Sequence, residues 1–307
     1  MYKGIMIDNI TILTVSWYSS KYLEKLLDNI LQKANKPSLI KFIIIDNSNG
    51  EDKDLLLLLN RFKNLQIFNY SPGIYKNLYA HAAALNFGFP KVDTKYALIL
   101  DPDIYIFKNK WDEFFIKELR NRNAKIIGNA FPSWWLGTYH NFPSPVFSFF
   151  ETKVFKKLDA DWFPFKASFI IQLRNLIFRH IIRGVYLFNR RTLNKFVIFR
   201  KIATFFESCF PICSLDTGSK LALKANSINC NILLLTAIYS QDVKKMQELS
   251  DTFSVEELTR YYEVYIYNDE LIVTHQYGSQ NFLLKTKKGK DIAYWYSLIN
   301  KIEDSVL

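Results

Sequence analysis

Paired carboxylates are the clearest carriers of chemistry in this sequence, because two of them can hold a divalent cation. Asp-x-Asp motifs lie at residues 52–54, 101–103 and 159–161. The first opens a helical pattern and the third lies in a polar loop, where acidic residues have structural roles. The second follows directly on the apolar run 96–100. We therefore predict that Asp101 and Asp103 face the solvent at a strand end and bind Mg²⁺ or Mn²⁺; the alternative is an Asp-Pro turn without a ligand.

The elements that must position these acids are strands and helices that alternate along the first half of the chain. Apolar runs predict strands at 10–15, 42–45, 65–70 and 96–100, and apolar spacings of three and four predict helices at 21–33 and 75–87. This alternation indicates an α/β fold with a mainly parallel sheet. The second strand also ends in an acid, Asp46. Ligands bind beyond the carboxyl ends of such strands, so two strands deliver aspartates to one edge.

In the second half of the chain, strands and helices no longer alternate regularly. We expect a strand at 126–130, a strand and helix within 146–158, a helix at 217–225, a strand at 231–235, a hairpin of 262–267 and 271–274, and a final helix at 291–302. Residues Asn268 and Asp269 supply the hairpin turn.

The segment 162–206 is basic and aromatic. It contains nine Lys or Arg residues, no Asp or Glu, and eleven aromatic residues, in a chain whose net charge is +11. Within it, polar side chains including Arg179 and Arg183 recur at helical spacing from 168 to 184, which predicts an amphipathic helix at an anionic membrane surface. The alternatives are a core-facing helix with a solvated face and a surface for single-stranded nucleic acid. No companion motif supports nucleic acid, so we expect none as a partner.

Composition and cysteine spacing indicate the size of the core, the location of the protein and the state of its thiols. With 49% hydrophobic residues in 307, the chain can bury a large core. The start of the chain has no signal-peptide pattern, and no apolar stretch is long enough to span a membrane, so we expect a cytoplasmic protein. Cys209, Cys213 and Cys230 are odd in number and lack paired spacing. That argues against a disulfide framework or a zinc site.

Four segments of the first 160 residues resemble a known family in order and spacing. They are 11–18 (TILTVSWY), 43–48 (IIIDNS), the helix ending in 84–88 (ALNFG) and 98–103 (LILDPD). Together they resemble glycosyltransferase family 2, which has the GT-A fold. The resemblance implies that Asp46 reads the base of a nucleotide diphosphate sugar donor, although an Asx turn is the alternative. It also implies that Asp101 and Asp103 hold the metal on the diphosphate, and that Ser71, Gly73 and Lys76 lie near the donor.

Beyond residue 160 the resemblance narrows to a few positions. Residues 150–158 are similar to the strand and helix below the family's acceptor site. Asp216, before a predicted helix, matches the position of the general base that an inverting transfer requires. Its alternative role is that of a helix N-cap, and Glu207 is a reserve candidate for the base. His275 matches a histidine that reaches the metal or diphosphate in some members; a structural histidine is the alternative. His81 is a weaker candidate near the phosphates.

We therefore predict a GT-A enzyme with a nucleotide-sugar-binding half at 1–130, an acceptor half at 131–280 that contains the insert 162–206, and a C-terminal helix in 281–307. It would be an inverting, metal-dependent glycosyltransferase, peripheral on the inner face of the cell membrane. Its acceptor would be a saccharide or lipid-linked saccharide in polysaccharide or glycan assembly. The rivals are a sugar-phosphate nucleotidyltransferase, whose Gly-rich phosphate loop is missing at 14–18, and a basic nucleic-acid-binding protein.

Overall fold

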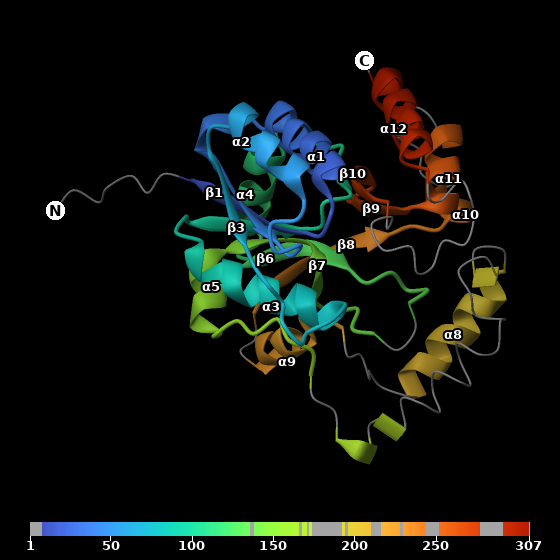
Figure 1. Cartoon of the computed structure of the whole chain (residues 1–307). Coiled ribbons are helices and arrows are strands. Elements are labelled where there is room, and N and C mark those ends of the chain that lie inside the picture. The colour runs from blue at the N-terminus through green and yellow to red at the C-terminus, as the bar shows by residue number, and fades with distance from the viewer. Residues whose placement is uncertain are drawn as a thin grey trace.

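The structure is a computed structural model that describes residues 8–135, 138–165, 168–170, 172–173, 192–193, 196–209, 216–227, 230–243, 252–276 and 291–306. Its centre is a ten-stranded sheet with the strand order β3-β2-β1-β4-β7-β6-β8-β9-β10-β5 (Figure 1). The predicted α/β class is therefore confirmed.

The first half of the sheet is parallel. Its strands are β1 (Ile10–Ser16), β2 (Ile40–Asp46), β3 (Leu65–Asn69) and β4 (Tyr96–Leu100). Every residue of β1 and of β4 is buried, because helices cover both faces of the sheet. The continuous apolar runs that predicted these strands are the direct result of that two-sided burial.

The second half of the sheet is mixed. Its strands are β5 (Ile104–Ile106), β6 (Ile126–Ala130), β7 (Pro143–Glu151), β8 (Ile232–Ala237), β9 (Glu263–Tyr267) and β10 (Glu270–His275). β7, β9 and β5 run against the other strands, which leaves the sheet mainly parallel, as predicted. At the predicted hairpin turn, Asn268 and Asp269 both have positive φ. Such a turn matches the twist of the two strands that it joins.

Helices form a layer on each face of the sheet (Figure 1). One layer contains α1 (Ser20–Lys33), α2 (Leu58–Arg61) and α4 (Trp111–Asn121), and the other contains α3 (Leu78–Gly88), α5 (Thr152–Lys157) and α9 (Ser219–Ser227). Short 3₁₀ helices lie at Pro37–Leu39, Lys53–Leu57 and Phe89–Lys91. Gly88 lets α3 approach the sheet, since a Cβ there would lie 2.8 Å from the side chains of Ile45 and Leu13.

The last helices form a separate packing unit beside β9. α10 (Ser240–Val243), α11 (Thr252–Tyr261) and α12 (Ile292–Val306) surround a core that includes the fully buried Trp295 and Tyr262. The predicted C-terminal helix is thus present, and it continues to Val306.

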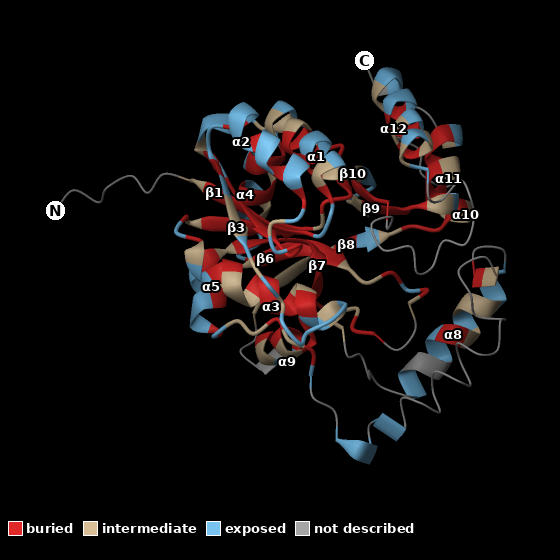
Figure 2. Cartoon of the chain, viewed as in Figure 1, coloured by how far each residue is buried: buried red, intermediate tan, exposed pale blue. Residues whose placement is uncertain are grey.

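Helix α8 (Val197–Cys209) lies away from the sheet and is largely exposed (Figures 1 and 2). Arg200 attaches it to the body through a 2.7 Å ion pair with Asp242, and its guanidinium lies 3.7 Å from the centre of the Tyr239 ring. Most of the amphipathic helix predicted at 168–184 lies outside the described residues. Among the helices that the structure describes, none combines the length and the apolar character needed to cross a membrane.

Candidate active site

A cavity of about 780 Å³ opens at the carboxyl ends of β1 and β4. The predicted site residues that line it are Lys76, Asp101, Asp103, Asp216 and His275, together with the weaker candidate His81. Asp46, Ser71 and Gly73 do not line it. Residues far apart in sequence therefore meet in one cavity, at the sheet edge where ligands were expected.

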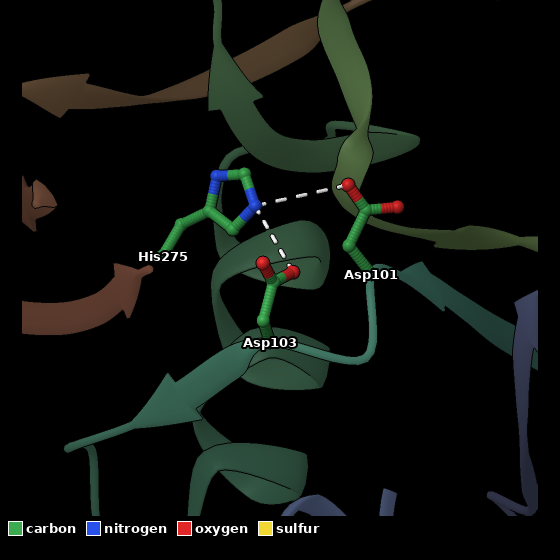
Figure 3. Close-up of side chains that lie close together, drawn as sticks. All are labelled: Asp101, Asp103 and His275. Carbon is green, nitrogen blue, oxygen red and sulfur yellow. Dashed lines mark ion pairs between the residues drawn. The ribbon is translucent and has the colours of Figure 1, made fainter. Parts of the chain in front are cut away.

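Asp101, Asp103 and His275 form a cluster at this cavity (Figure 3). Their ligand atoms all lie within 4.8 Å of one another. His275 Nε2 is 3.2 Å from Asp103 Oδ1 and 3.8 Å from Asp101 Oδ2. Strand pairing explains the meeting, because His275 ends β10 opposite Ile104, the first residue of β5, and the turn 101–103 leads into β5.

This cluster fits a divalent cation. Two carboxylates and an imidazole are suitable ligands, and metal–oxygen distances of about 2.1 Å put neighbouring ligand atoms roughly 3 to 4 Å apart. The two separations from His275 Nε2, 3.2 and 3.8 Å, lie in that range. Among the described residues this is the one group of three such side chains near enough to share an ion.

The two aspartates differ in exposure. The Asp101 side chain is 25% exposed, whereas Asp103 and His275 are each 2% exposed. The prediction that both carboxylates face solvent is therefore wrong for Asp103. The physical reason is that β10 pairs with β5 immediately after Asp103, and the N–H of Gln276 donates to the Asp103 carbonyl at 3.0 Å.

Burial and close charges change the acidity of these groups. Burial, together with the nearby carboxylates of Asp103 and Glu263, raises the pKa of Asp101 to about 7, although His275 acts in the opposite direction. Burial lowers the pKa of His275, but the same two carboxylates outweigh it and hold that pKa well above its ordinary value. Without a cation, the cluster therefore retains protons near neutral pH. A cation binding here would displace them.

His81 also faces this cluster. Its Nε2 lies 3.7 Å from Asp101 Oδ1, and it lines the cavity from α3. Burial lowers the pKa of His81 to about 4, so the ring is neutral at pH 7. A neutral ring can donate or accept a hydrogen bond but offers no positive charge to a phosphate.

Glu263 is a residue that the sequence analysis missed. It lies on β9 directly opposite His275, and its Oε2 is 3.1 Å from His275 Nδ1. The available signal was an acid inside the apolar strand pattern 262–267, since a buried charge in a strand requires a partner.

Asp46 occupies an Asx turn at the end of β2. Its Oδ1 accepts hydrogen bonds from the N–H and hydroxyl of Ser48 at 2.9 and 2.6 Å, and its Oδ2 accepts one from the Gly50 N–H at 2.9 Å. Asp46 is 1% exposed, while the adjacent Asn47 lines the cavity. The turn that was the alternative reading is therefore present, and contact with a donor base stays a prediction.

The loop before α3 is exposed. Ser71, Gly73 and Lys76 all lie on the surface, and Gly73 has a φ of +60°. Lys76, Asn77 and Leu78 line the cavity where α3 begins. A helix N-terminus favours anions, so this end of α3 is suited to a phosphate.

Asp216 lies in a tightly held loop before α9. Helix α9 begins at Ser219, so Gly218, with a φ of +85°, occupies the N-cap position. Asp216 lies two residues before that position and its carbonyl accepts the Ser219 N–H at 3.1 Å, so a capping role stays an alternative to the role of general base. The Gly218 N–H donates to Trp162 O at 2.8 Å, the Tyr139 hydroxyl donates to Thr217 O at 2.8 Å, and the Thr217 hydroxyl donates to Leu78 O at 3.2 Å.

The reserve candidate, Glu207, belongs to α8, and its side chain lies outside the described part of the structure.

Comparison with known proteins gives one family. The sequence profile of Glycosyl transferase family 2 matches residues 11–185, which is more than half of the chain. No curated protein matches the sequence.

Solved structures match more weakly. They include the mannosyltransferase PcManGT from Pyrobaculum calidifontis with GDP-Man and Mn²⁺, at a TM-score of 0.40 and 14% identity over 49% of this chain and 46% of that one. TarS from S. aureus with UDP-GlcNAc matches at a TM-score of 0.39 and 15% identity, over 51% of this chain and 48% of that one. The chain thus spans about half the length of the structures that it matches.

Proposed function

The chain belongs to glycosyltransferase family 2 and has the family's GT-A fold, and from this premise we propose that it transfers a sugar with inversion from a nucleotide diphosphate donor. The acceptor is a saccharide or a lipid-linked saccharide, in the assembly of a polysaccharide or glycan. One observation carries the proposal: Asp101, Asp103 and His275 line the same cavity as Asp216. A nucleotidyltransferase and a nucleic-acid-binding protein, the two rivals, gain no support from this family.

The donor side of the reaction rests on the cluster and on α3. Asp101, Asp103 and His275 would hold Mg²⁺ or Mn²⁺, which stabilises the charge of the departing diphosphate when bound. The N-terminus of α3 and Lys76 would bind the phosphates. Asp46 would contact the donor base, with Ser71 and Gly73 in the loop beside it.

The acceptor side rests on Asp216. Its carboxylate would take the proton of the acceptor hydroxyl while that oxygen attacks the anomeric carbon from the face opposite the diphosphate. The backbone hydrogen bonds of Thr217 and Gly218 restrain the loop that carries the Asp216 carboxylate. Glu207 remains the reserve for this role.

The insert would hold the protein on the inner face of the cell membrane. Its described part exposes apolar side chains, including Phe169 at 77%, Ile170 at 77% and Phe205 at 64%. Apolar side chains among basic residues are typical of a surface that enters the headgroup region of anionic lipid. A lipid-linked acceptor would then be presented at the same surface.

Thermal unfolding with UDP, GDP, CDP and dTDP sugars tests the donor proposal, since a bound donor stabilises the fold by mass action. We expect one nucleotide class to raise the unfolding temperature, and only when Mn²⁺ or Mg²⁺ is present. The same donor should be hydrolysed slowly without an acceptor. Failure of every donor to bind or react, with either cation, would contradict the proposal.

A further inference from the structure

The two nitrogens of the His275 ring face different groups. Nε2 faces Asp101 and Asp103, as described above, while Nδ1 is 3.1 Å from Glu263 Oε2. The antiparallel pairing of β9 and β10 places Glu263 directly opposite His275. The contact is therefore built into the strand register, where facing side chains lie within reach of each other.

Burial of the Glu263 carboxylate is energetically unfavourable by itself. Glu263 is 4% exposed, and the oxygen that faces His275 accepts a second hydrogen bond from the Tyr265 hydroxyl at 2.8 Å. A buried carboxylate destabilises a fold unless it is paired and hydrogen-bonded. Its two partners supply this compensation, and they hold the carboxylate in one orientation beside the ring.

We propose that Glu263 is a positioning residue for the cation site: its Oε2 accepts the Nδ1–H of His275 and so directs the Nε2 lone pair at an ion shared with Asp101 and Asp103. The inference rests on the proposed function, because it requires a cation in this cluster. Histidine ligands in proteins are oriented in this way by a carboxylate on their second nitrogen. Loss of that carboxylate typically weakens metal binding about 10- to 100-fold.

A purely structural role for Glu263 would have different consequences. In that case the Glu263–His275 pair would stabilise the junction of β9 and β10, and its loss would lower the unfolding temperature without a specific effect on cation affinity. Cation affinity, measured without any donor or acceptor, therefore separates the two roles.

The experiment measures Mn²⁺ binding to the whole chain by the loss of the free-ion electron paramagnetic resonance signal. Glu263→Gln should weaken binding about 10- to 100-fold. Tyr265→Phe, which removes the other partner of the same oxygen, is the matched control and should change binding less than about threefold. In a His275→Ala background, Glu263→Gln should have no further effect, because interacting residues are not additive.

Three outcomes of this binding experiment would overturn the proposal. The first is Mn²⁺ binding in Glu263→Gln that equals the wild type. The second is an effect of Glu263→Gln that persists undiminished in the His275→Ala background. The third is the absence of Mn²⁺ binding in the wild-type protein, and only this one also removes the cation from the proposed function.

A measurement on the wild type covers the case in which Glu263→Gln fails to fold. Nitrogen-15 resonances of the His275 ring, assigned with His275→Ala, report which nitrogen carries the proton in the presence of Zn²⁺, a diamagnetic ion that imidazole binds readily. We expect a proton on Nδ1 and none on Nε2. A proton on Nε2 with Zn²⁺ bound would overturn the proposal.

Discussion

Asp101 and Asp103 belong to one motif but differ in burial. Their substitution should therefore have similar effects on turnover and different effects on stability. Asp101→Asn and Asp103→Asn should each reduce turnover about 1000-fold or more, because a catalytic cation supplies several kcal/mol of transition-state stabilisation. The partly exposed Asp101 should be replaced with little loss of stability. The buried Asp103 should be more sensitive to replacement, since its neighbours leave little room for water.

The matched control is Asp54→Asn, which alters an exposed carboxylate of the first Asp-x-Asp motif. It should leave turnover unchanged. Turnover is measured with a donor found in the thermal screen, and folding by circular dichroism. If Asp101→Asn remained fully active, the cluster would not be the catalytic cation site.

Asp216 can be tested separately from the cation cluster. Asp216→Asn should lower turnover at least about 100-fold, the lower range for loss of a general base, while donor affinity is unchanged. Asp159→Asn is the control, because Asp159 is a fully exposed aspartate in another loop. Near-normal turnover in Asp216→Asn would instead favour Glu207 as the base.

At the level of single residues, the sequence predicts best where a local pattern decides the position. Asp101 and Asp103 were identifiable because they follow an apolar strand. Neither the burial of Asp103 nor the contact of Glu263 with His275 follows from the local pattern, which indicates only that Glu263 needs a partner. Both depend on the pairing of β10 with β5 and β9. The register between β10 and β5 joins residues that lie more than a hundred positions apart in the sequence, so no local pattern predicts it.

Within the part of the chain that the structure describes, the predicted strands and helices are present, including the hairpin and the final helix. Among the α-helices and strands that the structure describes, those missed are β5, α4, α8, α10 and α11. α4 was detectable, since Trp111, Phe115 and Leu119 recur at four-residue spacing and are all buried. β5 has only three residues, so its sequence alone carries almost no periodic signal.

The third Asp-x-Asp motif proves to be a junction between elements and not only a solvated turn. Asp161 accepts hydrogen bonds from Lys220 of α9, from Asn86 of α3 at 3.1 Å and from the Phe163 N–H at 3.0 Å. It therefore connects α3, α9 and the start of the insert, close to the loop that carries Asp216.

Asp161→Asn should destabilise the fold by about 1 kcal/mol, the usual contribution of such a hydrogen bond, measured by denaturant unfolding at pH 7. Burial would raise the pKa of Asp161, but its three donors, Lys220 first, hold that pKa below its ordinary value of 3.8. The carboxylate thus stabilises the fold above that pH and loses its effect as the pH falls through its lowered pKa. The difference between variant and wild type should therefore vanish in acid. A difference that is constant with pH would show that the charge of Asp161 has no role.

For the whole molecule, the fold class was predictable and the path of the chain through the sheet was not. Alternating strands and helices indicate an α/β fold, whereas the position of β7 between β4 and β6 depends on long-range packing. The structure also shows that Trp162 and Gly218, which lie on either side of most of the insert in the sequence, share a hydrogen bond. The first residue of the insert is thus fixed beside the loop that carries Asp216.

The positive charge of the insert leads to the last prediction. The protein should sediment with liposomes that contain anionic lipid and not with neutral ones, and added salt should release much of it, because screening acts within a Debye length of about 10 Å at 0.1 M. Replacing Arg179, Arg183, Arg190 and Arg191 by Gln should weaken binding by up to about 4 kcal/mol, at about 1 kcal/mol per charge. That corresponds to roughly a 1000-fold loss of affinity.

A control variant with the same net charge distinguishes lipid binding by the insert from attraction of the whole protein to anionic lipid. Replacing Lys53, Lys63, Lys117 and Lys157, all exposed on the α/β body, removes the same four charges and should leave most of the binding intact. The exposed aromatic side chains of the insert, such as Phe169 and Phe205, should retain a fraction that salt does not release. Equal losses in the two variants would mean that net charge alone attracts the protein to anionic lipid. Equal binding to neutral and anionic vesicles, or no vesicle binding at all, would contradict the proposed surface for anionic lipid. The absence of vesicle binding would leave the insert as a surface for a soluble anionic acceptor.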